Sequence, residues 1–249
     1  MSIEGPEELE GMRAAGAVVR QVLAAMKSAV RPGVTTAELD AVGAGVMEAQ
    51  GARSAPALVY KFPGANCISV NEEAVHGIPG ARALQAGDLV KLDVTIEKNG
   101  FMADAAITVP VGEVTEERQR LAECAERAFG KAMLVARAGF RVSEIGRVVE
   151  KEVQRSGFAV IRELAGHGIG RTIHEAPRVP NYPDARDNQI LTEGLVITVE
   201  PIIAAGSGKV FVAPDKWTMI TADHSASAHY EHTLVITRGA PILLTAALG

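Results

Sequence analysis

This sequence has little cysteine and no excess of positive charge. Its two cysteines, Cys67 and Cys124, provide neither a disulfide framework nor a CxxC metal-binding knuckle, and this usage fits a reducing cytoplasm. The net charge is −5 and the isoelectric point is about 5.7. This balance gives no electrostatic attraction to nucleic acid or to an anionic membrane surface, so we expect neither as a partner.

Long apolar runs are missing as well. The longest fall far short of the roughly 20 residues that cross a bilayer, and the N-terminal MSIEGPEELE is acidic, without the apolar core of a signal peptide. The remaining composition, 47% hydrophobic and 22% charged, is that of an ordinary globular protein. We therefore expect a cytoplasmic protein, and we expect it to be a monomer. Its 249 residues suffice for one large domain or two small ones.

Five ionisable residues stand out because they lie in or beside apolar, strand-like runs or a glycine-rich turn. They are Asp93 in DLVKLDVTI, Asp104 in FMADAAITV, His167 in GHGIG, Glu200 in GLVITVEP and Glu231 in YEHTLVIT. A carboxylate buried in such a setting must be paired, hydrogen-bonded or bound to a metal. Four carboxylates and one imidazole cannot neutralise one another, whereas two divalent cations could neutralise all of them.

The first two carboxylates belong to a predicted β-hairpin. Asn99-Gly100 is a strong signal for a two-residue hairpin loop, and this loop pairs Asp93 with Ala106. Asp104 then lies on the same face of the hairpin, roughly 7–8 Å from Asp93 at the backbone. The two side chains can converge on a pair of metal ions about 3.5–4 Å apart. Two solvated carboxylates are the alternative, which the flanking apolar runs and the three other residues disfavour.

Helices and an internal repeat predict the architecture. We expect helices over residues 6–30, from Thr35 or Thr36 to 50, over 115–139, and over 143–156 with Ser143 as the cap. RPGVTTAELDAVGAGVMEAQG at 31–51 resembles RAGFRVSEIGRVVEKEVQRSG at 137–157, and AGDLVKLDV matches TEGLVITVE farther on. These matches predict a single α+β domain over 1–249, made of two related halves, about 1–110 and 111–249. The site is expected where the halves meet.

Two further histidines accompany the cluster. His76 lies in NEEAVHGIPG and His174 in RTIHEAP. A lone histidine is more often structural than catalytic, but both lie near Gly or Pro residues and accompany a metal-type cluster. We therefore predict a functional role for both.

Five segments, taken in order, resemble the type I methionine aminopeptidases in their short bacterial form. They are VHGIP, DLVKLDVTIEKNGFMAD, GHGIGRTIHEAP, VITVEP and YEHTLVIT. The resemblance covers nearly the whole chain. It implies the pita-bread fold, a pseudo-two-fold antiparallel sheet with helices on its outer face. It also implies removal of the initiator methionine from nascent polypeptide N-termini near the ribosome, when the second residue is small.

The resemblance also implies a role for each candidate residue. Asp93 would chelate one metal, Asp104 and Glu231 would bridge two, His167 and Glu200 would complete the other, and His76 and His174 would contact the substrate. Oxygen-rich ligation with one imidazole suits Mn, Fe, Co or Zn. A water between two such ions becomes a nucleophile near neutral pH and attacks the scissile carbonyl. Glu200 is the candidate acceptor of its proton, and a histidine can stabilise the oxyanion.

Some positions depart from the family pattern. The methionine pocket matches at Phe62, Cys67 and Trp217, but Val59 and Ile173 stand where the family commonly has aromatic residues. Tyr60, one place along, is a candidate substitute for the first of these. His229 replaces the common Gln before Glu231, and Val75 replaces the Cys often found before the first catalytic histidine. We expect activity to be kept and side-chain preference to change.

Two other functions are consistent with parts of the sequence. An X-Pro peptidase of the same fold, such as a prolidase or aminopeptidase P, normally carries an extra N-terminal domain for which this chain has no room. A non-catalytic binding relative would have lost metal ligands, but all five are present.

Overall fold

A hairpin organises the centre of the fold. The computed structural model describes residues 1–246, and in it β4 (Leu89–Lys98) and β5 (Phe101–Pro110) pair in antiparallel fashion along their whole length. Asn99 and Gly100 turn the chain with φ of 53° and 82°, as a two-residue hairpin loop with two left-handed residues requires. Asp93 faces Ala106, so the register predicted from the turn is confirmed.

The hairpin belongs to a nine-stranded antiparallel sheet. Its order is β1-β4-β5-β14-β9-β7-β8, with β2 also paired to β4 and β15 to β14. The other strands are β1 (Arg53–Ser54), β2 (Cys67–Val70), β7 (Ala165–Gly168), β8 (Glu175–Pro180), β9 (Val196–Val199), β14 (Glu231–Val235) and β15 (Ile242–Leu243). Strand β14 lies between β5 and β9 and so joins the first half of the chain to the second.

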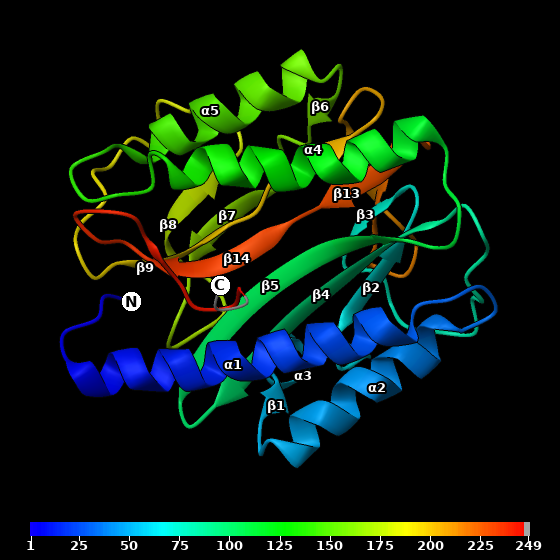
Figure 1. Ribbon diagram of the computed structural model, residues 1–249, viewed down its shortest axis with the longest axis horizontal. Helices are drawn as coiled ribbons and strands as arrows, with labels where there is room; N and C mark the ends of the chain where they lie inside the picture. The colour runs from blue at the N-terminus through cyan, green and yellow to red at the C-terminus, as the bar shows by residue number, and fades with distance from the viewer. Residues whose placement is uncertain (247–249) are drawn as a thin grey trace.

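Two pairs of helices cover the outer face of this sheet. Figure 1 shows α1 (Pro6–Ala29) and α2 (Thr36–Ala49) along the β4–β5 side, and α4 (Glu116–Met133) and α5 (Val142–Arg155) along the other. Each pair closes its own cluster of buried apolar side chains. On β4, Leu92 and Val94 join the α1 cluster, while Asp93 and Thr95 alternate to the inner face and line a cavity.

The helix ends show where local signals were overridden. Thr35 caps α2 in a capping box with Glu38, but α4 ends at Met133 rather than at Gly139 as predicted. The chain leaves the helix there because Ala138 donates a hydrogen bond to Thr237 O and Gly139 donates one to Leu191 O. These tertiary hydrogen bonds replace the last predicted turn.

Helix α5 also begins differently. Its N-cap is Arg141, without a side-chain cap. Ser143 lies inside the first turn, where its hydroxyl donates to Asn188 Oδ1 at 2.7 Å, so the predicted cap at Ser143 is wrong. The periodicity did not predict the short helix α3 (Ala55–Tyr60). Ser54 is its N-cap, and the Ser54 hydroxyl accepts from the Ala57 N–H.

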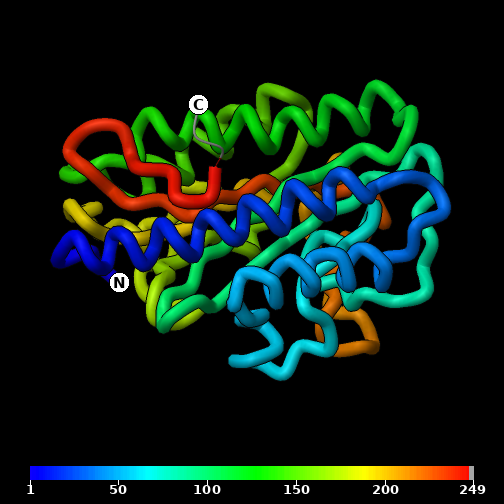
Figure 2. The backbone as a smooth tube through the Cα atoms, turned by 60° about the horizontal axis from the view of Figure 1, so that its bottom comes forward, coloured from blue at the N-terminus to red at the C-terminus, as the bar shows by residue number. Residues whose placement is uncertain are grey.

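Two small sheets close the inner side. One has the order β13 (Ser227–His229), β10 (Ile202–Ala204), β6 (Ala159–Val160), and the other β11 (Val210–Val212), β12 (Met219–Thr221), β3 (Glu73–Val75). The tube view shows the 210–221 segment at the bottom of the molecule, beside residues 51–66 (Figure 2). In residues 1–246, no helix combines the length and apolarity needed to cross a bilayer.

Candidate metal centre

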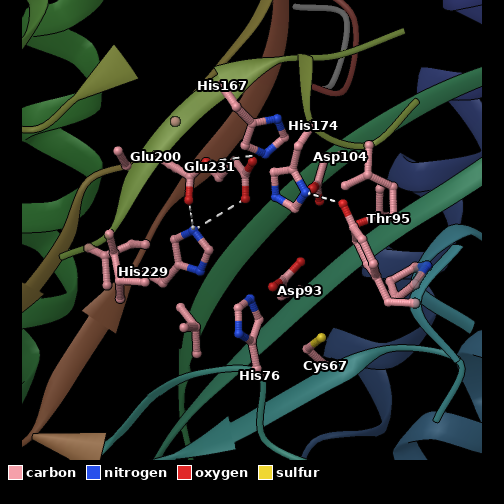
Figure 3. Close-up of a pocket in the computed structure, with 18 of the residues that line it drawn as sticks. Cys67, His76, Asp93, Thr95, Asp104, His167, His174, Glu200, His229 and Glu231 are labelled. Carbon is pink, nitrogen blue, oxygen red and sulfur yellow. Dashed lines mark hydrogen bonds and ion pairs between the residues drawn. The ribbon is translucent and has the colours of Figure 1, made fainter. Parts of the chain in front are cut away.

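Three carboxylates meet on the inner face of the central strands. Asp93 pairs with Ala106, and Ala106 pairs on its other side with Glu231 of β14. Asp104 lies two residues before Ala106 and therefore points to the same face. The small side chain of Ala106 leaves the space between them open. Figure 3 shows all three carboxylates directed into one cavity, as the predicted hairpin geometry requires.

His167 and Glu200 complete the group from β7 and the end of β9. His167 Nε2 lies 3.5 Å from Glu200 Oε1. Thr198 holds both residues: it accepts from the His167 N–H at 3.0 Å and donates its hydroxyl to Glu200 Oε1 at 2.9 Å. His167 Nδ1 donates to the Gly168 carbonyl at 2.9 Å. Because a carbonyl oxygen only accepts hydrogen bonds, Nδ1 carries the ring proton. The unprotonated Nε2 keeps its lone pair available to bind a metal ion.

The donor atoms are close enough to share cations. Asp104, His167 and Glu231 each offer a ligand atom within 4.8 Å of the others, and so do Glu200, His229 and Glu231. Several of these buried atoms lack a hydrogen-bond partner among residues 1–246, namely Asp104 Oδ1, Glu231 Oε1 and both ring nitrogens of His229. Unpartnered buried polar groups are costly. Divalent cations would satisfy them, and the donor set fits such ions.

The pKa shifts of the buried carboxyl and imidazole groups also favour a metal site. Burial raises the pKa of Glu200, Glu231 and Asp104 well above the ordinary carboxyl value, and the neighbouring carboxylates raise it further. The raised pKa values favour the protonated carboxyl groups when no cation is bound, and a bound cation would favour their release of protons. Burial lowers the pKa of His167 to about 4, so its imidazole is neutral at pH 7, the form that binds metals.

The two other predicted histidines lie at the cavity wall. His76 follows β3 with a φ of 58°. The ring of His174 packs against that of His167, with centroids 4.3 Å apart and planes tilted by 59°. The Tyr60 hydroxyl lies 2.6 Å from His174 Nδ1. Burial raises the pKa of Tyr60 and lowers that of His174, so both are neutral. A neutral hydroxyl and a neutral imidazole share one hydrogen bond here, and either Tyr60 or His174 Nδ1 can be its donor.

The predicted methionine pocket is mostly assembled. Phe62, Cys67, Ile173 and Trp217 all line the cavity, and Phe62 and Trp217 meet edge to face at 5.2 Å between centroids. Val59 is 40% exposed and is not one of the residues lining the cavity. Tyr60 stands there in its place. Neither Thr198 nor the contact between Tyr60 and His174 was identified from the sequence. For Thr198 a signal was available, because Thr198 and Glu200 are two residues apart and so lie on the same side of one extended segment.

Comparison with known proteins decides the family. The model of the metallopeptidase family M24 matches residues 10–238. The chain belongs to metallopeptidase family M24. This M24 metallopeptidase is 44% identical to methionine aminopeptidase 2 of Bacillus subtilis (strain 168), over 98% of the chain and 99% of the relative. It is 41% identical to a methionine aminopeptidase of Staphylococcus epidermidis, over 98% of each.

Solved structures agree. The crystal structure of methionine aminopeptidase from Thermotoga maritima superposes with a TM-score of 0.96 at 33% identity, covering 99% of this chain and 100% of that one. The predicted resemblance and the pita-bread fold are thereby confirmed. The prolidase from Pyrococcus furiosus gives a TM-score of 0.79 at 24% identity over 66% of its length, a likeness of fold alone. The X-Pro peptidase alternative is not favoured.

Proposed function

We propose that this M24 metallopeptidase is a methionine aminopeptidase, which removes the N-terminal methionine from new proteins whose second residue is small. One observation carries the proposal: a single cavity joins the buried carboxylate–imidazole cluster to an apolar wall containing Phe62, Cys67 and Trp217. A methionine side chain suits such a wall, because its flexible thioether packs well against aromatic edges. The fully matched relatives carry the same name.

The metal ligands we propose are the five residues predicted from the sequence. Asp93, Asp104, His167, Glu200 and Glu231 would hold two divalent ions of Mn, Fe, Co or Zn. When bound, such ions lower the pKa of water and polarise the scissile carbonyl. Glu200, whose Oε1 accepts a hydrogen bond from the Thr198 hydroxyl, would accept a proton.

The wall histidines act on the peptide. With Tyr60 as the donor to Nδ1, the ring proton of His174 would lie on Nε2, where it could be donated to the developing oxyanion or the leaving amine. His76 is the second donor on the opposite wall of the cavity (Figure 3). A crowded site around His76 and His174 would limit the second substrate residue to a small side chain. We propose that the protein meets nascent N-termini near the ribosome, in the cytoplasm, as a monomer.

The substrate assignment has a direct test. Metal-stripped protein, supplemented in turn with Mn, Fe, Co or Zn, is assayed for methionine release from Met-Ala-Ser and for hydrolysis of Gly-Pro. We expect release from Met-Ala-Ser with at least one ion and little hydrolysis of Gly-Pro. The reverse preference would make the protein an X-Pro peptidase.

Ile173 tests the pocket itself. It replaces an aromatic residue, so discrimination against norleucine- and Leu-Ala-Ser peptides should be weak, and Ile173→Phe should sharpen it. A contact of this kind is worth about 1–3 kcal/mol, or roughly 10–200-fold in kcat/KM. An unchanged ratio of kcat/KM values for the three peptides would remove Ile173 from the methionine pocket.

A further inference from the structure

His229 occupies a position in the cavity wall that the five-ligand set does not explain. It ends β13 and pairs with Ile202 of β10, which lies two residues after Glu200 in the chain. Its side chain is only 2% exposed and lines the same cavity as the carboxylates. Figure 3 shows its ring beside Glu200 and Glu231, with dashed lines running to both.

Neither ring nitrogen of His229 has a hydrogen-bond partner among residues 1–246. A second buried histidine in this chain shows the usual arrangement. His232 lies 2.9 Å from the Thr245 hydroxyl through Nδ1 and 3.2 Å from the Tyr230 hydroxyl through Nε2. Within the described residues, His229 Nδ1 has no comparable contact, and His229 Nε2 faces only the carboxylates of Glu231 and Glu200, without forming a hydrogen bond to either. Such a setting is unusual for a buried imidazole and suits a ligand. The contacts of the His229 ring nitrogens therefore differ from those of His232, a buried histidine held by two hydroxyl groups.

The distances around His229 suit a shared cation. Its Nε2 lies 3.2 Å from Glu231 Oε2 and 3.9 Å from Glu200 Oε2. Two donors that each lie about 2.1 Å from one ion are themselves roughly 3–4 Å apart. The other oxygen of Glu200 faces His167 Nε2 at 3.5 Å. Glu200 therefore lies between two imidazoles, one on each of its oxygens.

We propose that His229 is an additional nitrogen ligand of the metal centre, acting with Glu200 and Glu231. The proposal rests on the proposed metal site but goes beyond its five ligands. A second imidazole makes the donor set softer, because imidazole suits Zn, Fe and Co while carboxylate-rich sets suit Mn. This chain should therefore favour Zn, Fe or Co over Mn more strongly than a variant with an amide at the same position.

X-ray absorption spectroscopy of the full chain loaded with Zn²⁺ or Co²⁺ tests the ligand directly. Wild type should show about twice the imidazole scattering per protein molecule that His229→Gln shows, because only His167 remains in the variant. His174→Gln is the matched control: it removes another cavity histidine and should keep the wild-type scattering. Circular dichroism establishes that both variants are folded.

Metal affinity gives the second measurement. By calorimetry, His229→Gln should bind Zn²⁺ at least about 10–100-fold more weakly, with a smaller change for Mn²⁺. Equal imidazole scattering in wild type and His229→Gln would overturn the proposal and make His229 a hydrogen-bonding neighbour of Glu231. That result would leave methionine release intact, so it is distinct from a failure of the proposed function.

Discussion

Asp104 is a buried carboxyl group at the centre of the proposed metal site. Its Oδ1 is buried without a partner among the described residues, and the negative charge of Glu231 adds to burial in raising its pKa. Asp104→Asn keeps the shape and removes the charge. We expect kcat/KM to fall by at least ~10³-fold while the fold survives, because the mutation also relieves repulsion. Calorimetry should show that the variant has lost part of its metal binding, and full activity would exclude Asp104 from the site.

The Tyr60 hydroxyl is expected to act through its hydrogen bond to His174. Tyr60→Phe removes the hydrogen bond to His174 Nδ1, a contact worth about 0.5–1.5 kcal/mol. The value of kcat should therefore fall by roughly 2–12-fold, with metal content unchanged. Leu58→Ala, an exposed position on the same short helix, is the control and should behave as wild type. A variant that loses metal instead would place Tyr60 in a structural role.

The residues that the sequence predicted well are those with a local signature. Asp93 and Asp104 follow from the Asn99–Gly100 turn, since the loop length fixes the register. Val59 and Tyr60 show the limit. Successive residues of a helix differ by about 100° in direction, so only knowledge of α3 decides which of the two faces the cavity. The sequence contains no periodicity long enough to reveal that six-residue helix.

At the level of elements, the glycines of strand β7 let its neighbouring strands pack closely on either side of His167. A Cβ at Gly168 would fall 2.2 Å from Ala176 O, and one at Gly166 would fall 2.5 Å from Thr198 O. Only glycine lets the neighbouring strands approach this closely. The glycines therefore serve strand packing beside the site rather than binding a phosphate.

Gly168→Ala should force β7 and β8 apart. Overpacking of this kind costs about 1–3 kcal/mol, which in a chain of this size lowers Tm by roughly 2–10 °C. Gly45→Ala, on α2 where an added Cβ meets nothing within 4 Å, is the control and should leave Tm unchanged or slightly higher. Differential scanning calorimetry of both variants decides the point. Equal Tm values would show that β7 and β8 can separate without cost.

At the scale of the whole molecule, the cavity draws on segments that only the tertiary fold brings together. His76, Trp217 and His229 come from or beside the two small sheets, whose strands of two or three residues give too little pattern to be predicted. In the large sheet, β4 and β5 were more predictable, because each has ten residues rich in apolar side chains and the Asn99–Gly100 turn joins them. The division into two related halves stays a prediction.

The metal should stabilise the whole fold, and more at higher pH. Burial and mutual repulsion raise the folded-state pKa of Glu200, Glu231 and Asp104. In the metal-free protein these groups thus favour folding at low pH, and that stability is lost as pH rises above the unfolded carboxyl pKa. Cations remove the penalty. At an ion concentration of 100 times the Kd measured at pH 6, Tm should rise by about 5–10 °C at pH 6. The same ion concentration should give a larger rise at pH 8, because Kd falls as the ligands lose their protons. A rise that shrinks with pH would contradict this account.

The central claim is that a cation held by this carboxylate–imidazole cluster makes the protein a methionine-releasing enzyme. The most direct measurement is methionine release from Met-Ala-Ser as Mn, Fe, Co or Zn is titrated into the metal-stripped protein. We predict no release without metal, and release that rises with occupancy until the cluster is filled. Full-rate release by the metal-free protein, or none with any of the four ions, would contradict the account.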